Sequence, residues 1–437
     1  MIPSSNGLWY AAALLAGKLS RVTARLSTRT EPEPDGPLLP PGISVIIPCR
    51  NGRDLLQAQL PGICEDLGNR GEILVIDNGS EDGTEQWLRT EWPLVRVDVS
   101  QQPLSFAAAI NRGLGLARYR RICLLNDDML LRPGFFQALE APFERMPYLF
   151  CATAQIIFPE GVRREETGKA VMRQERPEDF PIRCDVPLPG EDGTWVLYGS
   201  GGCSLYDAAR LRSLGGLDEE YSPAYVEDLD IGYRAWQRGW PTVFAAGAVV
   251  EHRHRATTSR YFTPAELDRI LEINYLKFLA RSVADPLIFD RLWKQAIRRL
   301  RLRTKSDPAA AAALRQAALI ALTGNGGASH PESYAAREKG FLAMTNGSVA
   351  VYPGAGTAPK PRLLVLCDSP ETASVTPEDA VLIITGCIVP PQMPVSHTEV
   401  VCVGKCDDMS ATLHGVADET RRKWGLRSRH YLPNAPS

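Results

Sequence analysis

The sequence predicts an α/β protein built on a mixed, mostly parallel sheet with helices on both faces. From Ile43 onward, short β-rich apolar runs alternate with segments whose apolar residues recur about every 3.6 positions. This alternation is typical of parallel strands joined by helices. The chain has 437 residues, more than one typical domain, so we also expect attachments to this core.

Four predicted strands open the sheet, each of them a short apolar run that ends in polar residues. They cover Ile43–Cys49, Glu72–Asn78, Val95–Ser100 and Arg121–Asp127. Ser80 and Asp82 are helix-capping residue types in front of a helix that ends near Glu91. Pro133 suits the first turn of another helix.

The core is predicted to begin near Ile43, with different segments on either side. Residues 1–42 combine a short apolar run with a proline-rich linker. Residues 283–350 continue a helical stretch that starts at Thr263, and residues 351–437 form a small α/β unit. The strands of that unit are predicted over Arg362–Cys367, Ala380–Thr385 and Glu399–Val403.

Charge and cysteine content exclude several classes of function. The chain carries 49 Lys+Arg and 51 Asp+Glu, so its net charge of −2 provides no general attraction for nucleic acid. Its ten cysteines do not form a zinc-ligand pattern, which favours reduced thiols in a cytoplasmic protein. The apolar run Leu8–Ala16 is far shorter than the roughly 20 residues that span a bilayer. Its cations follow it, unlike those of a secretory signal, so an interfacial helix and a helix packed on the core both remain open.

Polar residues follow the first two strands at the sheet edge where ligands of open α/β sheets bind. The first strand ends in Pro48, Arg50 and Asn51. The second ends in Asp77, Asn78 and Ser80, and its carboxylate can accept a hydrogen bond from a base or a ribose. These loops predict a nucleotide site, although the same residues also form ordinary turns and helix caps.

The fourth strand ends in Asn126, Asp127 and Asp128, two carboxylates with no nearby cation before Arg132. Mg²⁺ and Mn²⁺ take oxygen ligands from one or two carboxylates together with phosphate. A divalent metal carried by a nucleotide diphosphate fits this pair, and a solvated turn is the alternative.

Two further sets of residues are candidates for catalysis or for ligand binding. Glu227 and Asp228 occupy the first turn of a predicted helix, where the helix dipole favours an ionised carboxylate that can act as a base. Complementing the dipole is also a common structural role for acidic residues there. His252 and His254 follow the predicted strand Val243–Glu251, so either is a candidate metal or phosphate ligand.

Together these residues resemble glycosyltransferase family 2, whose fold is of the GT-A type, over about residues 43–282. The finer resemblance is to rhamnosyltransferases and related enzymes of bacterial surface polysaccharide. Asn126–Asp128 resembles the family's Asp-x-Asp motif and Glu227-Asp228 its Glu-Asp pair. Further matches are Ser44–Pro48 with the opening strand, Val75–Ser80 with the nucleoside-binding strand, and Ala109–Gly113 with the segment before the metal motif.

The resemblance implies an inverting, metal-dependent transfer of a sugar to a glycan or lipid-linked acceptor. Asp228 is then the base, beside Glu227, and Asp128 binds Mn²⁺ or Mg²⁺ with His252 or His254. Gly201 and Gly202 are placed near the acceptor. The donor, a UDP-, dTDP- or GDP-linked sugar, is expected to contact Pro48, Arg50, Asn51, Asp77, Asn78, Ser80, Asn111, Arg112, Asn126 and Asp127.

The same resemblance implies a polyprenyl-linked or glycan acceptor and a cytoplasmic protein, peripheral at the inner face of the membrane. The alternative is a non-catalytic module that binds nucleotide sugars. A nucleotidyltransferase would need a more basic first loop than Arg50 and Arg53 provide. The basic stretch Lys294–Lys305 is either a membrane-contacting helix, with Ile297, Leu300 and Leu302 at the lipid, or a solvated face. Residues 351–437 are faintly similar to the lobe junction of GT-B glycosyltransferases, which suggests an accessory unit.

Overall fold

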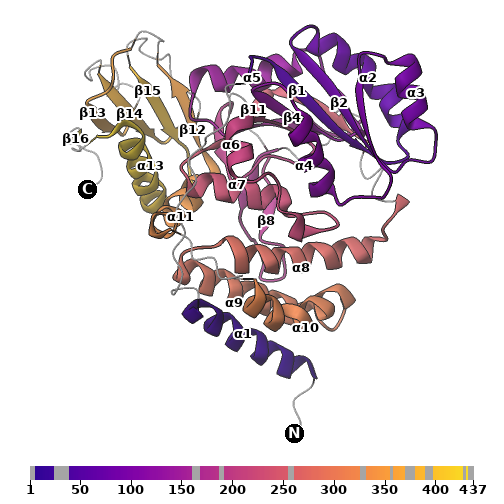
Figure 1. The fold of residues 1–437 in the computed structure, drawn as a ribbon. Coiled ribbons are helices and arrows are strands. Elements are labelled where there is room, and N and C mark those ends of the chain that lie inside the picture. The colour runs from indigo at the N-terminus through magenta and orange to yellow at the C-terminus, as the bar shows by residue number, and fades with distance from the viewer. Residues whose placement is uncertain are drawn as a thin grey trace.

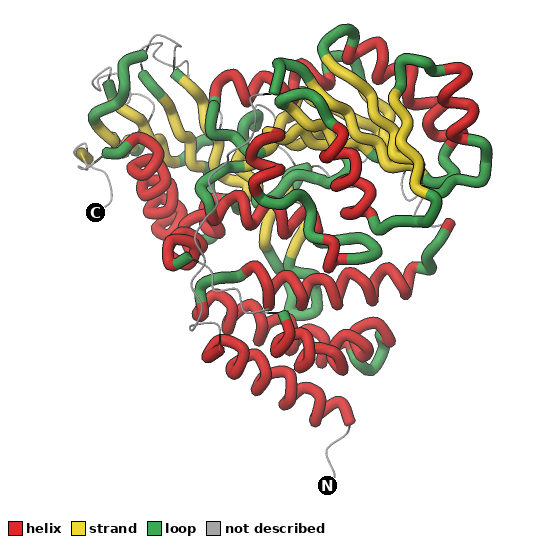
Figure 2. Tube along the Cα trace, viewed as in Figure 1, coloured by secondary structure: helices red, strands yellow, loops and turns green. Residues whose placement is uncertain are grey.

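The computed structural model describes residues 5–23, 39–159, 168–186, 191–253, 260–324, 331–354, 358–369, 379–388, 397–426 and 430–431. Within these ranges fourteen strands form one continuous mixed sheet, which Figure 2 shows as a band of strands crossing the molecule. The predicted mixed α/β fold, with many parallel strand pairs and helices on both faces, is confirmed.

The N-terminal part of the sheet carries the predicted strands. In spatial order it runs β3 (Arg96–Ser100), β2 (Gly71–Asn78), β1 (Ile43–Cys49), β4 (Arg121–Leu125), β10 (Cys203–Asp207), β6 (Cys151–Ile157), β11 (Thr242–His252) and β9 (Thr194–Val196). β1 to β4 pair in parallel, whereas β10 is antiparallel to both of its neighbours. Parallel strands place their carboxyl ends at one edge, so the loops after β1, β2 and β4 meet there.

The side chains of β1 alternate between two hydrophobic cores, one on each face of the sheet. Val45 and Ile47 pack in the core that contains α2 (Arg53–Leu67) and α5 (Phe135–Arg145). Ile46 points to the other core, with α4 (Phe106–Leu116) and α6 (Ala208–Ser213). Both faces are therefore buried, which explains why β1 is apolar at nearly every position. Helix α3 (Thr84–Glu91) also contributes side chains to the first core.

Three helices below the sheet begin with the same signal, a capping side chain followed by proline. They are α8 (Pro264–Ser282), α9 (Pro286–Arg303) and α10 (Pro308–Thr323), capped by Thr263, Asp285 and Asp307. Each cap accepts backbone N–H groups of the first turn, and proline has no N–H to leave unsatisfied there. The predicted helical stretch is thus a set of separate helices, three of them with a capping side chain, completed by α11 (Glu332–Met344).

The N-terminal helix α1 (Ser5–Thr23) packs on this helical layer, farthest from the sheet (Figure 1). The indole N–H of Trp293 donates to the carbonyl of Ala13 at 2.9 Å. Gly17 lies against the same indole, where a Cβ would come within 2.5 Å of the ring. Arg21 donates to the carbonyl of Val283 at 3.0 Å. In the described part of the chain, no helix combines the length and apolar character needed to cross a membrane.

The predicted membrane-contacting arrangement of Lys294–Lys305 is wrong for three of its residues. Ile297 and Leu300 are buried in the core rather than facing lipid. Arg299 is also buried, and its guanidinium forms an ion pair with the Glu272 carboxylate. The helical period turns this side of α9 toward α8, since Glu272 lies on that helix, and leaves only the opposite side to solvent.

The C-terminal unit extends the same sheet. Strand β12 (Asn346–Pro353) pairs with β9 on one side and β15 (Glu399–Val403) on the other, and the predicted boundary at residue 350 falls inside it. Beyond β15 lie β14 (Ala380–Thr385), β13 (Leu363–Cys367) and β16 (His430–Tyr431), with α13 (Met409–Trp424) packed against α11. The core and this unit therefore share one sheet.

Candidate active site

A cavity of about 580 Å³ opens at the carboxyl ends of β1, β2 and β4. Most of the residues predicted from sequence line this one cavity, although they come from positions up to two hundred residues apart. The predicted residues that line it are Pro48, Arg50, Asn78, Asn126, Asp127, Asp128, Gly201, Gly202, Glu227, Asp228 and His252.

Short strand pairing brings Asp128 and His252 together. β5 (Met129–Leu131) pairs with the end of β11, with Met129 opposite His252. The Asp128 Oδ2 atom lies 3.4 Å from the His252 Nε2 atom. The Oδ1 atom of Asp128 is buried and makes no hydrogen bond within the described structure. Such a buried oxygen normally has a partner, so this oxygen points to a ligand that completes the site.

The chemistry of this pair fits a divalent cation. Carboxylate oxygen and imidazole nitrogen are both ligands for Mn²⁺, and carboxylate oxygen suits Mg²⁺. Among the residues that the structure describes, no group of three His, Cys, Asp or Glu side chains could hold a metal alone. The protein would thus supply part of the coordination and a phosphate-bearing ligand the rest. His254 lies outside the described residues.

A buried glutamine, missed in the sequence analysis, holds the Asn-Asp-Asp turn. Gln59 on α2 is almost fully buried, and its side-chain amide donates to the carbonyl of Met129 at 2.7 Å and to that of Asn126 at 2.5 Å. These two bonds span the turn that carries Asp127 and Asp128. The geometry of the acidic turn therefore depends on a residue 67 positions earlier in the chain.

Two glycines allow the chain to approach the acidic turn closely. A Cβ on Gly202 would lie 2.5 Å from the Asn126 side-chain nitrogen, and one on Gly52 would lie 2.4 Å from an Asp127 oxygen. The backbone N–H of Asn126 also donates to the carbonyl of Gly202 at 2.9 Å. Gly202 was predicted near an acceptor, and here it packs directly behind Asn126.

Glu227 and Asp228 begin α7 (Glu227–Gln237), as predicted, and both line the cavity. One oxygen of Asp228 accepts the backbone N–H of Gly201 at 3.3 Å, and the other accepts the N–H of Leu229 at 2.8 Å. Burial, reinforced by the charge of Asp228, raises the pKa of Glu227 and favours its neutral form. The pair therefore combines an oriented carboxylate with a buried acid that resists ionisation.

The backbone just before this pair is strained, and a buried asparagine holds it. Tyr225 and Val226 have φ angles of 73° and 80°, a left-handed region that is unfavourable for a β-branched residue. The Asn274 side-chain nitrogen on α8 donates to the carbonyls of Tyr221, Ala224 and Tyr225 at 2.7, 2.9 and 3.1 Å. Asn274 therefore fixes the direction in which the chain enters α7, and with it Asp228.

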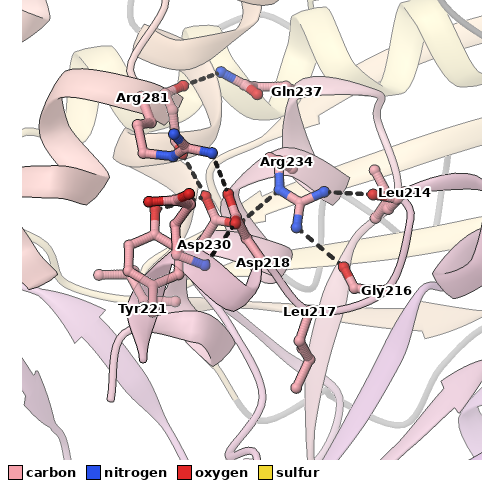
Figure 3. Close-up of polar contacts among 12 residues, drawn as sticks. Leu214, Gly216, Leu217, Asp218, Tyr221, Asp230, Arg234, Gln237 and Arg281 are labelled. Atoms are coloured by element: carbon pink, nitrogen blue, oxygen red, sulfur yellow. Dashed lines mark hydrogen bonds and ion pairs between the residues drawn. The ribbon is translucent and has the colours of Figure 1, made fainter. Parts of the chain in front are cut away.

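An ion-pair network fixes the rotation of α7 about its axis (Figure 3). Arg234 forms an ion pair with the buried Asp230 at 2.7 Å and donates to the carbonyls of Leu214 and Gly216. The Tyr221 hydroxyl donates to Asp230 at 3.2 Å. Because Asp230 is held on this side, Asp228, two positions earlier on the helix, is turned toward the cavity.

The loops after β1 and β2 are joined by hydrogen bonds beside the cavity. The N–H of Asn51 donates to the Ser80 hydroxyl at 2.9 Å, and Asp77 accepts the N–H of Ser80 at 3.0 Å. Asn78 exchanges two hydrogen bonds with the backbone of Leu104. Asn51, Asp77 and Ser80 thus shape the cavity edge without lining it.

Asn111 and Arg112 are not brought to the cavity. The Asn111 side chain exchanges two hydrogen bonds with the backbone of Leu217, at 2.8 and 2.9 Å. Arg112 forms an ion pair with Asp98 on β3. Both side chains tie α4 to neighbouring segments, so the structure gives them packing roles and their donor contacts stay a prediction.

Much of the remaining wall is apolar or aromatic and was not predicted from sequence. The guanidinium of Arg50 stacks over the ring of Tyr261, which lies 4.1 Å away. The short strands β7 (Ala170–Met172) and β8 (Ile182–Cys184) form a separate sheet, and both contribute residues to the lining. The apolar and aromatic lining residues are scattered along the chain and form no sequence motif. They include Leu104, Phe106, Phe180, Ile182, Tyr198, Tyr225, Phe262 and Leu271.

Comparisons with known proteins bear on this site. Residues 44–214 match the family model described as Glycosyl transferase family 2. An N-acetylglucosaminyl-diphospho-decaprenol L-rhamnosyltransferase of Mycobacterium tuberculosis is 27% identical over 212 residues, covering 43% of this chain and 68% of the relative. A validoxylamine A glucosyltransferase of Streptomyces hygroscopicus subsp. limoneus is 26% identical over 261 residues, covering 53% of this chain and 56% of the relative.

Similar solved structures include a mannosyltransferase from Pyrobaculum calidifontis in complex with GDP-Man and Mn²⁺. Its TM-score is 0.42 at 15% identity, covering 73% of this chain and 95% of that one.

The matched region contains β1, β2, β4 and the Asn-Asp-Asp turn, which together form one side of the cavity. The class of this region is therefore that of a glycosyltransferase domain. The family model that this region matches is glycosyltransferase family 2, the family that the sequence motifs resemble.

Proposed function

We propose that this protein transfers a sugar from a nucleotide-diphosphate donor to a hydroxyl of a glycan or lipid-linked acceptor, with inversion at the anomeric carbon and with the help of a divalent metal. The observation that carries this proposal is the gathering of Asp128, His252 and Asp228 on one cavity. The relatives named above transfer rhamnose to a decaprenol-linked acceptor and glucose to validoxylamine A. They support the reaction class rather than a particular sugar.

Asp128 and His252 are the residues that would hold Mn²⁺ or Mg²⁺. The metal would stabilise the negative charge that develops on the departing diphosphate. The buried, unpaired Oδ1 of Asp128 supports this assignment. Arg50, Asn78, Asn126 and Asp127 line the same cavity and are the residues best placed to bind the donor.

Asp228 acts as the general base in this proposal. It takes the proton of the acceptor hydroxyl as the oxygen bonds to the anomeric carbon and the bond to the diphosphate breaks. The N–H of Gly201 holds one carboxylate oxygen, and the helix N-terminus favours the ionised form. A neutral Glu227 beside it avoids a second buried negative charge, consistent with its raised pKa.

The acceptor and the location of the protein belong to the same proposal. A polyprenyl-linked acceptor would place the protein in the cytoplasm, peripheral at the inner face of the membrane. The apolar and aromatic wall formed by Phe106, Phe180 and Leu271 supports an acceptor that carries an apolar portion. We further propose an accessory role for the C-terminal unit.

The test measures binding and turnover together. Thermal unfolding in the presence of Mn²⁺ is followed with UDP-, dTDP- and GDP-linked sugars, and the best donor is then assayed for hydrolysis and transfer. Asp128→Ala should abolish the Mn²⁺-dependent part of the stabilisation. Asp290→Ala, which removes a solvent-accessible carboxylate on α9, is the matched control and should not. Donor binding without any hydrolysis or transfer would instead support the non-catalytic module.

A further inference from the structure

The exposed large apolar side chains are concentrated on one part of this molecule. Eleven such side chains occur in the described ranges, and eight of them lie on α1, α9 and α10. The other three are Leu94, Leu116 and Val186. Single exposed leucines are normal on soluble proteins, whereas a concentration of them marks an interaction surface.

The outer side of α1 carries the clearest stripe. Leu8, Leu15 and Leu19 are 63%, 59% and 51% exposed, and their spacing of seven and four residues places them on one face of the helix. Ala13 and Gly17 lie on the opposite face, against Trp293. The described residues cover only one face of this helix, and its other apolar face needs a second apolar or interfacial surface.

The two neighbouring helices, α9 and α10, each carry exposed leucines beside an exposed lysine or arginine on one face. On α9, Arg298, Leu302 and the following Lys305 are exposed at helical spacing. On α10 the exposed stripe contains Arg315, Leu319 and Leu322. The two helices both pack against α1, which lies outermost in Figure 1. The guanidinium of Arg301 on α9 stacks 4.3 Å over the ring of Tyr10, which fixes the α9 cations beside α1.

The charged side chains that α1 and α10 contribute to this surface are all basic. Neither α1 nor α10 contains an Asp or Glu residue. Lys18, Arg298 and Arg315 take part in none of the ion pairs that form among the described residues. These cations therefore remain available to an anionic partner, although the net charge of the whole chain is only −2.

We infer that α1, together with the exposed stripes of α9 and α10, is a docking face for an anionic lipid bilayer. Leucines beside lysine and arginine suit the region between headgroups and acyl chains, where a helix lies parallel to the membrane. A second copy of this chain fits less well, since self-docking would bring the same cations together. The proposed function enters this inference only through the lipid-linked acceptor. The docking itself is inferred from the exposed leucines and cations of the surface.

This assignment differs from the membrane contact expected for the basic stretch Lys294–Lys305. It takes up the interfacial alternative for the helix around Leu8–Ala16, which the structure also packs on α9 and α10. Only the solvent-facing side chains of the basic stretch belong to the docking face, and α1 forms the centre of that face. Helix α8 lines the cavity through Leu267 and Leu271 and also packs against α9 and α10, so α8 alone separates these two helices from the candidate active site, and α1 lies beyond them.

The test is flotation of the full-length protein with vesicles of phosphatidylcholine and phosphatidylglycerol, and with phosphatidylcholine alone. Binding to the anionic vesicles at low salt is expected, with a steep loss as ionic strength rises. The double variant Leu15→Glu, Leu19→Glu should bind at least about tenfold more weakly, because it adds charge to the buried side of the contact. The matched control is Leu94→Glu with Leu116→Glu, which changes exposed leucines elsewhere and should bind normally.

Several outcomes would overturn the inference. These are no binding at low salt, an equal loss in the control pair, or a dimer of the wild type that the α1 variant dissociates. Thermal unfolding checks that both variants fold. Hydrolysis of the nucleotide sugar without vesicles should be unchanged in the α1 variant, so a failure of the proposed chemistry and a failure of docking are measured separately.

Discussion

Replacing Asn274, which does not itself line the cavity, should disable the candidate active site. Its side-chain nitrogen donates to three backbone carbonyls of the segment 221–225. This segment leads into the left-handed residues Tyr225 and Val226, directly before Glu227 and Asp228. In Asn274→Ala these carbonyls lose their donor. At about 1 kcal/mol for each net hydrogen bond, the free energy of unfolding should fall by about 2–4 kcal/mol.

The effect on turnover should exceed the effect on binding. Without the Asn274 side chain the strained segment can relax and Asp228 can shift. A displacement of Asp228 by about 1 Å lowers kcat by about a hundredfold. The proposed donor site lies on the loops after β1, β2 and β4, so the affinity for the nucleotide should change little. Steady-state kinetics, with nucleotide binding by calorimetry, separates the two quantities.

The matched control for this experiment is Gln237→Ala. Gln237 is also a buried amide, but its nitrogen donates to the Ser282 carbonyl and to Glu338 at the far end of α7. It should reduce stability with a much smaller effect on kcat. If the two variants lost kcat to the same degree, or if Asn274→Ala kept it within a few-fold, Asn274 would not position the base.

Three further predictions concern single groups. Asp228→Asn should lower kcat by about a thousandfold with nucleotide affinity retained, and turnover near the wild-type rate would remove Asp228 from the reaction. Gly202→Ala should reduce kcat/KM about tenfold or more, because its Cβ would lie 2.5 Å from the Asn126 side chain. Gly115→Ala on α4, whose Cβ would meet no described atom within 4 Å, is the tolerated control. Burial raises the pKa of Glu338 from 4.5 to about 7, so the stability it contributes is full below pH 4.5 and is lost as pH rises to about 7. Urea unfolding of Glu338→Gln should therefore show a flatter pH profile over this range, by about 3 kcal/mol for the cited shift; identical profiles would contradict the assignment.

The strands that sequence predicted best are the fully buried ones. β1, β14 and β15 begin and end at the predicted residues, because their apolar runs are bounded by polar or glycine-containing segments. β4 ends at Leu125, two residues earlier than predicted, since the Asn126 N–H turns away to bond Gly202. Strands of three residues such as β5 and β9 carry no usable pattern, because their conformation depends on distant partners.

The candidate site divides in a similar way. Asp128, Asp228 and His252 were predicted because each follows or begins a regular element whose end can be recognised in the sequence. Gln59 and Asn274 were missed, since each lies within a helix and acts on a segment at least 49 residues away. Their role depends on the packing of α2 and α8, which a linear pattern does not contain.

The strand β12 has a consequence for how this protein can be divided. It supplies hydrogen bonds to β9 of the core and to β15 of the C-terminal unit at once. A chain shortened before Asn346 would leave β9 as an unprotected edge, open to pairing with other molecules. The C-terminal unit is therefore not a removable module. Heat or denaturant should unfold both parts in one cooperative step, and a protease should find no cut at this junction that releases a stable core.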